Sequence, residues 1–330
     1  NLGSGNGVTY YAGIVFSGEK LYIRCTDCTI TAPGHGDNAV YEGLYAEGGV
    51  EVSGSLRISN ADLGIEATDG AGVNGTVSIS GVGLGIEAGS VSFGSGNITI
   101  SSTEGPAVLA DRCSNHDAIV TLNTVGAYAL AVDELNIPSR QKGVMNVNLT
   151  TDGRCGYDNS AAVFIQNNAE INGALNINVS ADYSGYRGSE ELTCCGLAVN
   201  KLVCQSNDEN RFINCTMNVK GCEKLVISGL FAMKLDMRWD TRAKVCSNVN
   251  VGGAHESLMG VCCIHYSGGH NKTSIQSVIR GAGEQDVALA ILAYDPYRED
   301  NVVSELYAST DCKDGAAVLF PADYKLLDEA

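Results

Sequence analysis

One stretch of the sequence gathers the side chains that a sugar-binding site uses. It reads Asp236-Met237-Arg238-Trp239-Asp240-Thr241-Arg242 and contains the only tryptophan of the chain. Aromatic rings pack on apolar surfaces, and charged groups hydrogen-bond to hydroxyls. The alternative is that Trp239 packs on a neighbouring loop while the charges form solvated ion pairs. If the later loops lie beside this one, the candidate ligand-binding residues are Arg238, Trp239, Asp240, Arg242, Tyr266, Tyr294 and Tyr297.

A second group of such side chains lies in residues 150–160 and 180–195. Tyr, Asp, Arg and Gly suit adaptable polar recognition, but they are equally typical of any exposed loop. The candidates in this group are Tyr157, Tyr183, Tyr186 and Arg187.

The thirteen cysteines are an odd number, so an oxidising compartment would leave at least one thiol unpaired. Cys215, Cys262 and Cys263 lie in strand-like segments, where a thiol behaves as a small buried hydrophobe. Cys25-Thr26-Asp27-Cys28 has zinc-knuckle spacing, but no second Cys-x-x-Cys or His pair accompanies it. The sequence therefore predicts neither a metal site nor a cofactor.

The elements that must position these residues follow from a repeat. A four-residue phrase, here called the tetrad, has Gly or Ala first and Ile, Leu or Val second. The tetrads begin at Gly13, Gly43, Gly64, Gly85, Ala107, Ala129, Ala162, Gly196, Gly229, Gly260, Ala288 and Ala317. Recurrence at a fixed period indicates a solenoid, because each repeat buries its apolar face against the next.

Between the tetrads lie segments with period-two alternation, which is typical of a strand with one buried face. Leu56-Arg57-Ile58-Ser59 is an example, and Val50-Glu51-Val52 supplies a third strand. Together these patterns predict an all-β, single-stranded, right-handed parallel β-helix. We expect about 11–12 coils with three short strands per coil.

The spacing of the tetrads separates this fold from other repeat folds. Successive second positions from Leu44 to Leu130 are 21, 21, 22 and 22 residues apart, and later intervals are longer. A β-propeller repeats over about 40 residues, and a β-sandwich does not return to one phrase. We therefore expect one domain over residues 1–330, with short regular coils over about 43–143 and longer-looped coils over about 144–330.

Alternation also assigns the faces. The second and fourth tetrad positions should point into the core and the third position outward. The third position is Glu66 and Glu87 early, and later becomes apolar, as at Leu109 and Phe164. We expect long loops or the chain end to cover this outward apolar stripe; otherwise it is a surface for binding or self-association.

The segments Gly64-Ile65-Glu66-Ala67-Thr68-Asp69 and Gly85-Ile86-Glu87-Ala88, each followed by a Val/Ile-Ser strand, resemble secreted right-handed parallel β-helix proteins of clostridia and related gut bacteria. Those proteins are of a carbohydrate-binding type and share the pectate-lyase-like superfold. The resemblance implies an extracellular location and contact with polysaccharide. It also leaves calcium open, because lyases of this superfold use calcium.

Pectin-degrading hydrolases of this superfold carry a set of short catalytic motifs, and this chain departs from them. Only Gly34-His35-Gly36 is present; the Asp-Asp pair before it and the Arg-Ile-Lys after it are missing. A glycosidase needs two carboxylates on opposite sides of the sugar bond. The sequence therefore predicts no catalytic residue.

The formal charge of −17 argues against nucleic acid and anionic membranes as partners, because both are bound through basic patches. No apolar run is long enough to span a membrane. We expect an extracellular or cell-surface protein from which a signal peptide has been removed.

The sequence is compatible with three functions. The first is a non-catalytic protein that binds polysaccharide or a cell-surface glycan, or acts as a surface adhesin. The second is a polysaccharide lyase or glycoside hydrolase, and the third is a structural or assembly module that self-associates through the outward apolar stripe.

Overall fold

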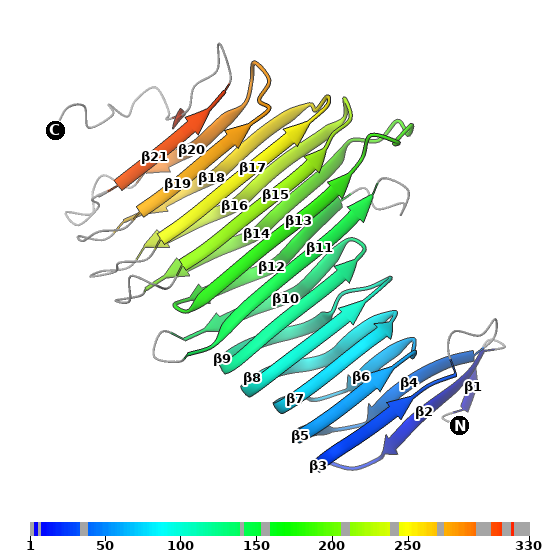
Figure 1. Ribbon diagram of the computed structural model, residues 1–330. Coiled ribbons are helices and arrows are strands. Elements are labelled where there is room, and N and C mark those ends of the chain that lie inside the picture. The colour runs from blue at the N-terminus through cyan, green and yellow to red at the C-terminus, as the bar shows by residue number, and fades with distance from the viewer. Residues whose placement is uncertain are drawn as a thin grey trace.

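In the computed structural model, every described element is a β-strand, and the strands stack into an elongated parallel solenoid (Figure 1). The structure describes residues 3–5, 8–33, 39–138, 142–152, 159–205, 212–237, 244–268, 274–294, 305–311 and 318–319. Within this part of the chain, no helix is present that could cross a membrane. The predicted all-β parallel β-helix is confirmed.

The strands form two faces that are joined into one 22-stranded sheet. The tetrad face consists of β2 (Val8–Phe16), β4 (Ala39–Ala46), β6 (Leu63–Ala67), the first parts of β8 (Leu84–Ser102) and β9 (Val108–Val125), β10 (Tyr128–Ile137), β12 (Asn159–Ile171), β14 (Leu192–Cys204), β16 (Leu225–Met237), β18 (Ser257–Ser267), β20 (Val287–Tyr294) and β22 (Val318–Leu319).

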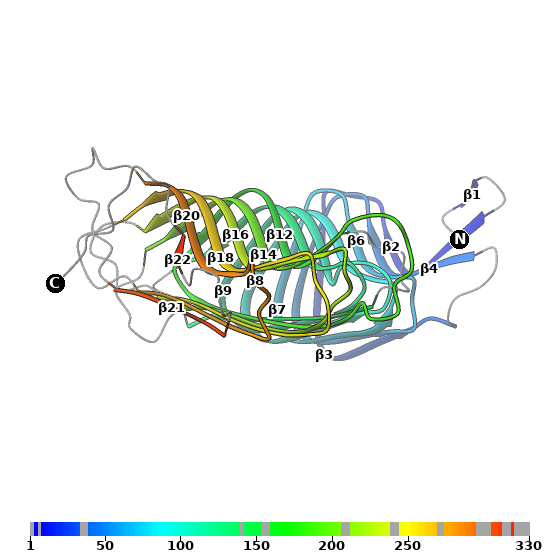
Figure 2. The same cartoon turned by 90° about the horizontal axis from the view of Figure 1, so that it is seen from above.

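The alternating face lies across the core from the tetrad face, as the view from above shows (Figure 2). It consists of β3 (Lys20–Thr31), β5 (Gly49–Ser59), β7 (Ala71–Val82), the second parts of β8 and β9, β11 (Val144–Asp152), β13 (Ala174–Asp182), β15 (Phe212–Lys220), β17 (Lys244–Gly252), β19 (Ser274–Arg280) and β21 (Glu305–Thr310). At the N-terminal end, β1 (Gly3–Gly5) pairs antiparallel with β2.

The second tetrad positions form one continuous column. Ile65 pairs with Ile86, and Ile86 pairs with Val108 in the next coil; all three side chains are fully buried. The same register runs through all twelve tetrads, from Ile14 in β2 to Val318 in β22. The stacking predicted from the repeat is therefore confirmed.

Close packing across the core explains why the first tetrad position is small. A Cβ on Gly43 would lie 2.4 Å from Cγ2 of Ile58, and one on Gly64 would lie 2.6 Å from Cγ2 of Ile79. Both isoleucines belong to the alternating face, so the two faces meet without an intervening layer. A larger first residue would have to displace a buried branched side chain.

Each early coil has the three predicted strand segments, but a bend, not a loop, separates two of them. Gly54, Gly75 and Gly96 have φ values of +107°, +96° and +100°, in the left-handed region that favours glycine. Gly75 pairs with Gly96. These glycines therefore stack along one corner, and the second and third segments continue as a single bent strand.

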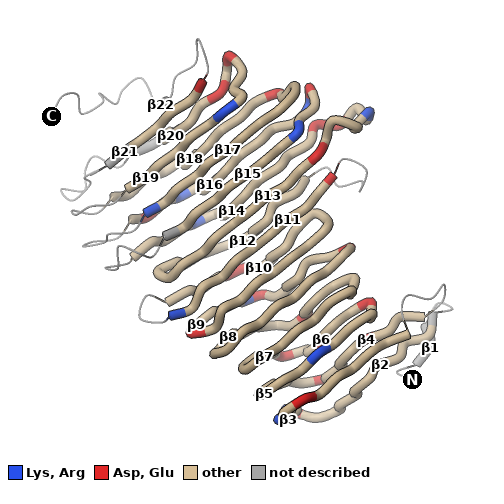
Figure 3. The backbone as a smooth tube through the Cα atoms, in the orientation of Figure 1, with Lys and Arg blue, Asp and Glu red and all other residues tan. Residues whose placement is uncertain are grey.

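Outward side chains of the alternating face form amide ladders. Asn178 Nδ2 donates to Asn148 Oδ1, and Asn148 Nδ2 donates to Asn123 Oδ1, both at 2.9 Å. The charged residues of β11, β13, β15 and β17 lie at the strand ends (Figure 3). The repeated Asn of these strands thus hydrogen-bond between coils.

Eleven of the thirteen cysteines are described, and all eleven are free thiols. Burial raises the pKa of Cys113 and of Cys195 to about 12 each. Cys25 and Cys28 lie on β3, and no group of three or more potential metal ligands occurs among the described residues. Seven of the eleven thiols are buried and act as small core residues, as predicted for Cys215, Cys262 and Cys263, and the other four are partly exposed.

Candidate functional site

The first predicted site lies largely outside the described residues. The predicted residues that lie outside the described part of the chain are Arg238, Trp239, Asp240, Arg242 and Tyr297 of the first group and Tyr157 of the second group. Tyr294 is the last residue of β20 and pairs with Tyr266 of β18. The structure therefore brings together the strand positions of Tyr266 and Tyr294.

Two of the predicted site tyrosines belong to the core. Tyr183 and Tyr266 are each only 1% exposed. The hydroxyl groups of Tyr183 and Ser160 share a hydrogen bond of 2.7 Å, so the phenol is satisfied inside the protein. Both rings are buried, so neither presents an open face to a ligand.

In the second group, Tyr186 is partly buried and Arg187 is exposed, and both interact within their own loop. The Tyr186 hydroxyl donates to the Glu190 carbonyl at 3.4 Å. Arg187 Nη1 donates to the carbonyls of Ser184 and Tyr186, at 3.0 and 2.8 Å. The Nη1 group of Arg187 therefore stabilises the turn.

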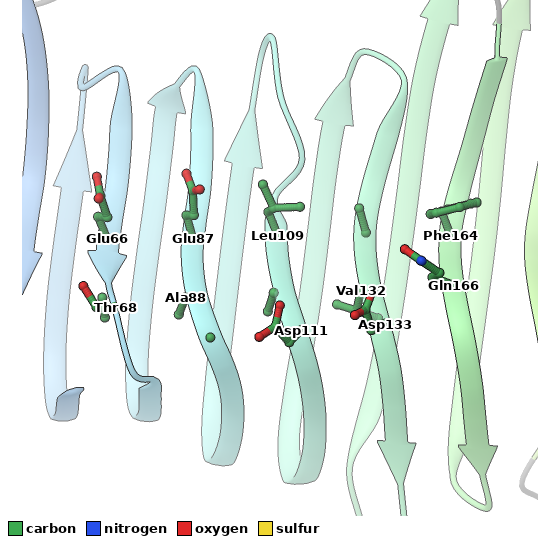
Figure 4. A pocket seen from close by; sticks show the side chains of 14 residues that line it. Glu66, Thr68, Glu87, Ala88, Leu109, Asp111, Val132, Asp133, Phe164 and Gln166 are labelled. Atoms are coloured by element: carbon green, nitrogen blue, oxygen red, sulfur yellow. The ribbon is translucent and has the colours of Figure 1, made fainter. Parts of the chain in front are cut away.

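A groove on the outer surface of the tetrad face is the site that the structure adds. It has a volume of about 400 Å³ and extends over β6, β8, β9, β10 and β12 (Figure 4). With roughly 4.8 Å between neighbouring strands, five coils give the groove a length of about 19 Å along the solenoid axis. It is therefore long and open, as an extended ligand requires.

Two parallel rows of side chains line this groove. The first row holds the third tetrad positions, which pair in register from coil to coil: Glu66, Glu87, Leu109, Ala131 and Phe164. The second row lies two residues further along each coil: Thr68, Gly89, Asp111, Asp133 and Gln166. Carboxylates thus occur in both rows (Figure 4).

The C-terminal part of the groove is an apolar platform. Phe164 is 39% exposed and Leu109 is 37% exposed, although both follow a fully buried column residue. The Phe164 ring contacts that of Tyr128, with 5.5 Å between the ring centroids and a 46° tilt. Tyr128 therefore supports an aromatic ring that remains open to a ligand.

The apolar stripe is only partly covered. Cys262 and Ala290, the third tetrad positions of β18 and β20, are buried, whereas Leu109 and Phe164 line the groove. The third tetrad positions are therefore buried at these two later coils and exposed at these two positions of the groove.

The N-terminal part of the groove is acidic. Burial raises the pKa of Glu66, and the charge of Glu87 raises it further. Glu42, on β4, has a pKa of about 7 because it is buried and is repelled by Glu66 and Glu87. No Lys or Arg is among the described residues that line the groove.

A second hollow, of about 340 Å³, lies at the turns around His255 and Asp286. His255 Nε2 and Asp286 Oδ2 are 2.8 Å apart, and both side chains are almost fully buried. Asp286 also accepts a hydrogen bond from the Gly283 amide. No Ser, Thr or Cys is among the described residues lining this hollow, so the pair has no hydroxyl or thiol nucleophile beside it and joins two turns.

The alternation of the tetrad positions predicts that Glu66 and Glu87 point outward, but it does not by itself indicate a groove. The tetrad register could have indicated it, because this register stacks the third positions of successive coils in one row and the residues two positions later in a second row. Asp111 and Asp133 follow from that register once Ala110 is aligned with Val132. No protein-family model matches the chain, and no curated protein or solved structure shows significant similarity to it.

Proposed function

We propose that this protein binds a polysaccharide chain, without cleaving it, along the groove of the tetrad face. The supporting observation is the row that ends in Phe164: carboxylate acceptors and an exposed aromatic ring lie in one line along the solenoid axis. Sugars present both hydroxyl donors and apolar faces, so a polymer of sugars matches this alternation of polar and apolar positions.

The groove dimensions support an extended polymer over a small ligand. A compact ligand is normally enclosed by its pocket, whereas this groove is shallow and open at the surface. A chain aligned with the solenoid axis would meet an equivalent pair of positions on every coil. The proposal includes an extracellular or cell-surface location, which the resemblance to secreted β-helix proteins suggests.

Hydrolysis is the second candidate function, and one observation favours it. Glu87 and Asp111 belong to opposite rows of the groove, on neighbouring coils, and so would flank a chain lying between the rows. A glycoside hydrolase places an acid and a base or nucleophile on the two sides of the scissile bond. Non-catalytic binding is preferred because the sequence lacks a complete catalytic motif set.

The test is a glycan-binding screen followed by calorimetry with the best polymer. Phe164→Ala should weaken binding at least tenfold, because a supported aromatic platform contributes strongly to stacking. Tyr22→Ala is the matched control, because Tyr22 is exposed on β3 of the alternating face. It should bind like the wild type.

Two outcomes would overturn the proposal. One is the absence of binding to any polysaccharide, or an equal loss in Phe164→Ala and Tyr22→Ala. The other is the release of new reducing ends from the bound polymer, abolished by Asp111→Asn, which would establish the hydrolase instead.

A further inference from the structure

The charge in the groove is unusual because its like charges are stacked. Glu66 and Glu87 hold the same register position on adjacent strands, and both point to the outer surface (Figure 4). Like charges directly opposite each other on neighbouring strands are destabilising. A positive group between or above the two carboxylates would relieve this repulsion.

The described residues supply no such positive group at the groove. Arg112, on β9, forms an ion pair with Glu134, with 3.5 Å between Nε and Oε2. Neither residue lines the groove. Glu66, Glu87, Asp111 and Asp133 therefore give the groove four carboxylates without a lining cation in the described part of the chain.

Glu42 is an independent sign of a missing partner. Glu42 is only 5% exposed, and its Oε2 atom has no hydrogen-bond donor among the described residues. The repulsion from Glu66 and Glu87 shows that its carboxylate lies near theirs. A positive group bound at Glu66 and Glu87 would offset the repulsion that these two carboxylates exert on Glu42.

From these observations we infer that the bound polysaccharide carries protonated amino groups, which Glu66 and Glu87 hold at the N-terminal end of the groove. This inference rests on the proposed polysaccharide binding. The described residues contain no cluster of three or more ligands for a metal ion, because the carboxylates are spread along the axis instead of converging. Charges repeated along a polymer match that spread.

The same charge argues against polyanionic chains. A polyuronate would place its carboxylates against four others in a groove with no lining Lys or Arg among the described residues. Ligands of the pectin type are therefore disfavoured, although the resemblance to the pectate-lyase-like superfold would suggest them. An amino-sugar polymer keeps the hydroxyls and apolar faces that suit Phe164 and adds the positive charge.

The experiment compares three oligosaccharides of equal length by calorimetry at mildly acidic pH: a glucosamine oligomer, its fully N-acetylated counterpart and an oligogalacturonate. The glucosamine oligomer should bind at least tenfold more tightly than the acetylated one, and the oligogalacturonate should not bind. Raising the salt concentration should weaken only the glucosamine oligomer, because its advantage is electrostatic.

The matched variants locate the effect. The double substitution Glu66→Gln and Glu87→Gln keeps side-chain shape and should bring the glucosamine and acetylated oligomers to equal affinity, because the loss falls mainly on the glucosamine oligomer. Glu134→Gln is the control, because Glu134 pairs with Arg112 outside the groove. Circular dichroism checks that each variant is folded.

The outcomes separate this inference from the proposed function. Equal binding of the amino and acetylated oligomers, or an unchanged preference in the double variant, would refute the amino-group assignment and leave polysaccharide binding standing. If no oligosaccharide binds and no polymer in the screen binds, both proposals fail.

Discussion

Gly85 of β8 faces Ile100 of the same strand across the core, and a Cβ atom on Gly85 would lie 2.3 Å from Cγ2 of Ile100. The carbonyl oxygen of Ala107 in the next coil would be 2.2 Å from the same Cβ. The small first tetrad residue is thus required by a side chain fifteen positions later in the sequence and by the backbone of the following coil.

The first prediction tests this contact. Gly85→Ala should lower the free energy of unfolding by about 1–3 kcal/mol, because the added methyl group overpacks the core. Gly185→Ala is the control: a Cβ there would meet nothing within 4 Å. Urea denaturation measures both, and equal stability of the two variants would contradict the packing account.

The second prediction concerns the aliphatic column. Ile86 is fully buried between Ile65 and Val108, whereas Ile119 points outward from β9 and is 50% exposed. Ile86→Ala should cost about 2–5 kcal/mol and Ile119→Ala less than about 0.5 kcal/mol. Chemical denaturation provides the comparison, and similar losses would mean that the column does not stabilise the solenoid.

The third prediction concerns Tyr183 as a core residue. Tyr183→Phe removes its buried hydrogen bond to Ser160 and should cost about 1–2 kcal/mol, while polysaccharide binding stays unchanged. Tyr186→Phe, which removes only a long bond at the surface, should change stability by less than about 0.5 kcal/mol. Loss of binding without loss of stability in Tyr183→Phe would restore its role as a ligand contact.

The stacking of coils could be predicted from the sequence because one local rule repeats. Each second tetrad residue, such as Ile86, must be buried, and only direct stacking buries all of them. Residue type does not carry the same information in the loops. Tyr183 and Tyr186 are three residues apart in one loop, yet Tyr183 is fully buried in the core whereas Tyr186 is only partly buried against it.

The groove could not be recognised from the sequence because it depends on two strand registers at once. Glu87 and Asp111 are separated by a whole coil, and they come to flank one groove only when the third positions and the residues two further on stack in parallel rows. The platform formed by Phe164 also depends on its contact with Tyr128, which lies in the preceding coil.

The fourth prediction concerns thiol reactivity. In the native protein, buried Cys113 and Cys195 should react with an alkylating reagent at least about a hundredfold more slowly than half-buried Cys222, because only the thiolate reacts and burial raises their pKa values to about 12. Mass spectrometry after timed labelling measures the rates. Denaturation should make the rates equal, and fast native labelling of Cys113 would show that its coil opens.

The fifth prediction follows from the pKa of Glu42, which is about 7 in the folded protein against an ordinary value of 4.5. Between these values the unfolded chain has released the proton while the folded protein retains it, so stability falls as the pH rises from about 4.5 to 7. Below pH 4.5 both states are protonated, and this loss is absent.

Glu42→Gln removes the titrating group and should therefore flatten that decline. The variant should match the wild type near pH 4 and exceed it by about 2–3 kcal/mol at pH 8, where the wild type holds a buried, repelled carboxylate. Glu47→Gln is the control because Glu47 is exposed on the same coil. Urea denaturation across this pH range decides the matter: a wild-type decline that persists in Glu42→Gln would assign it to other groups.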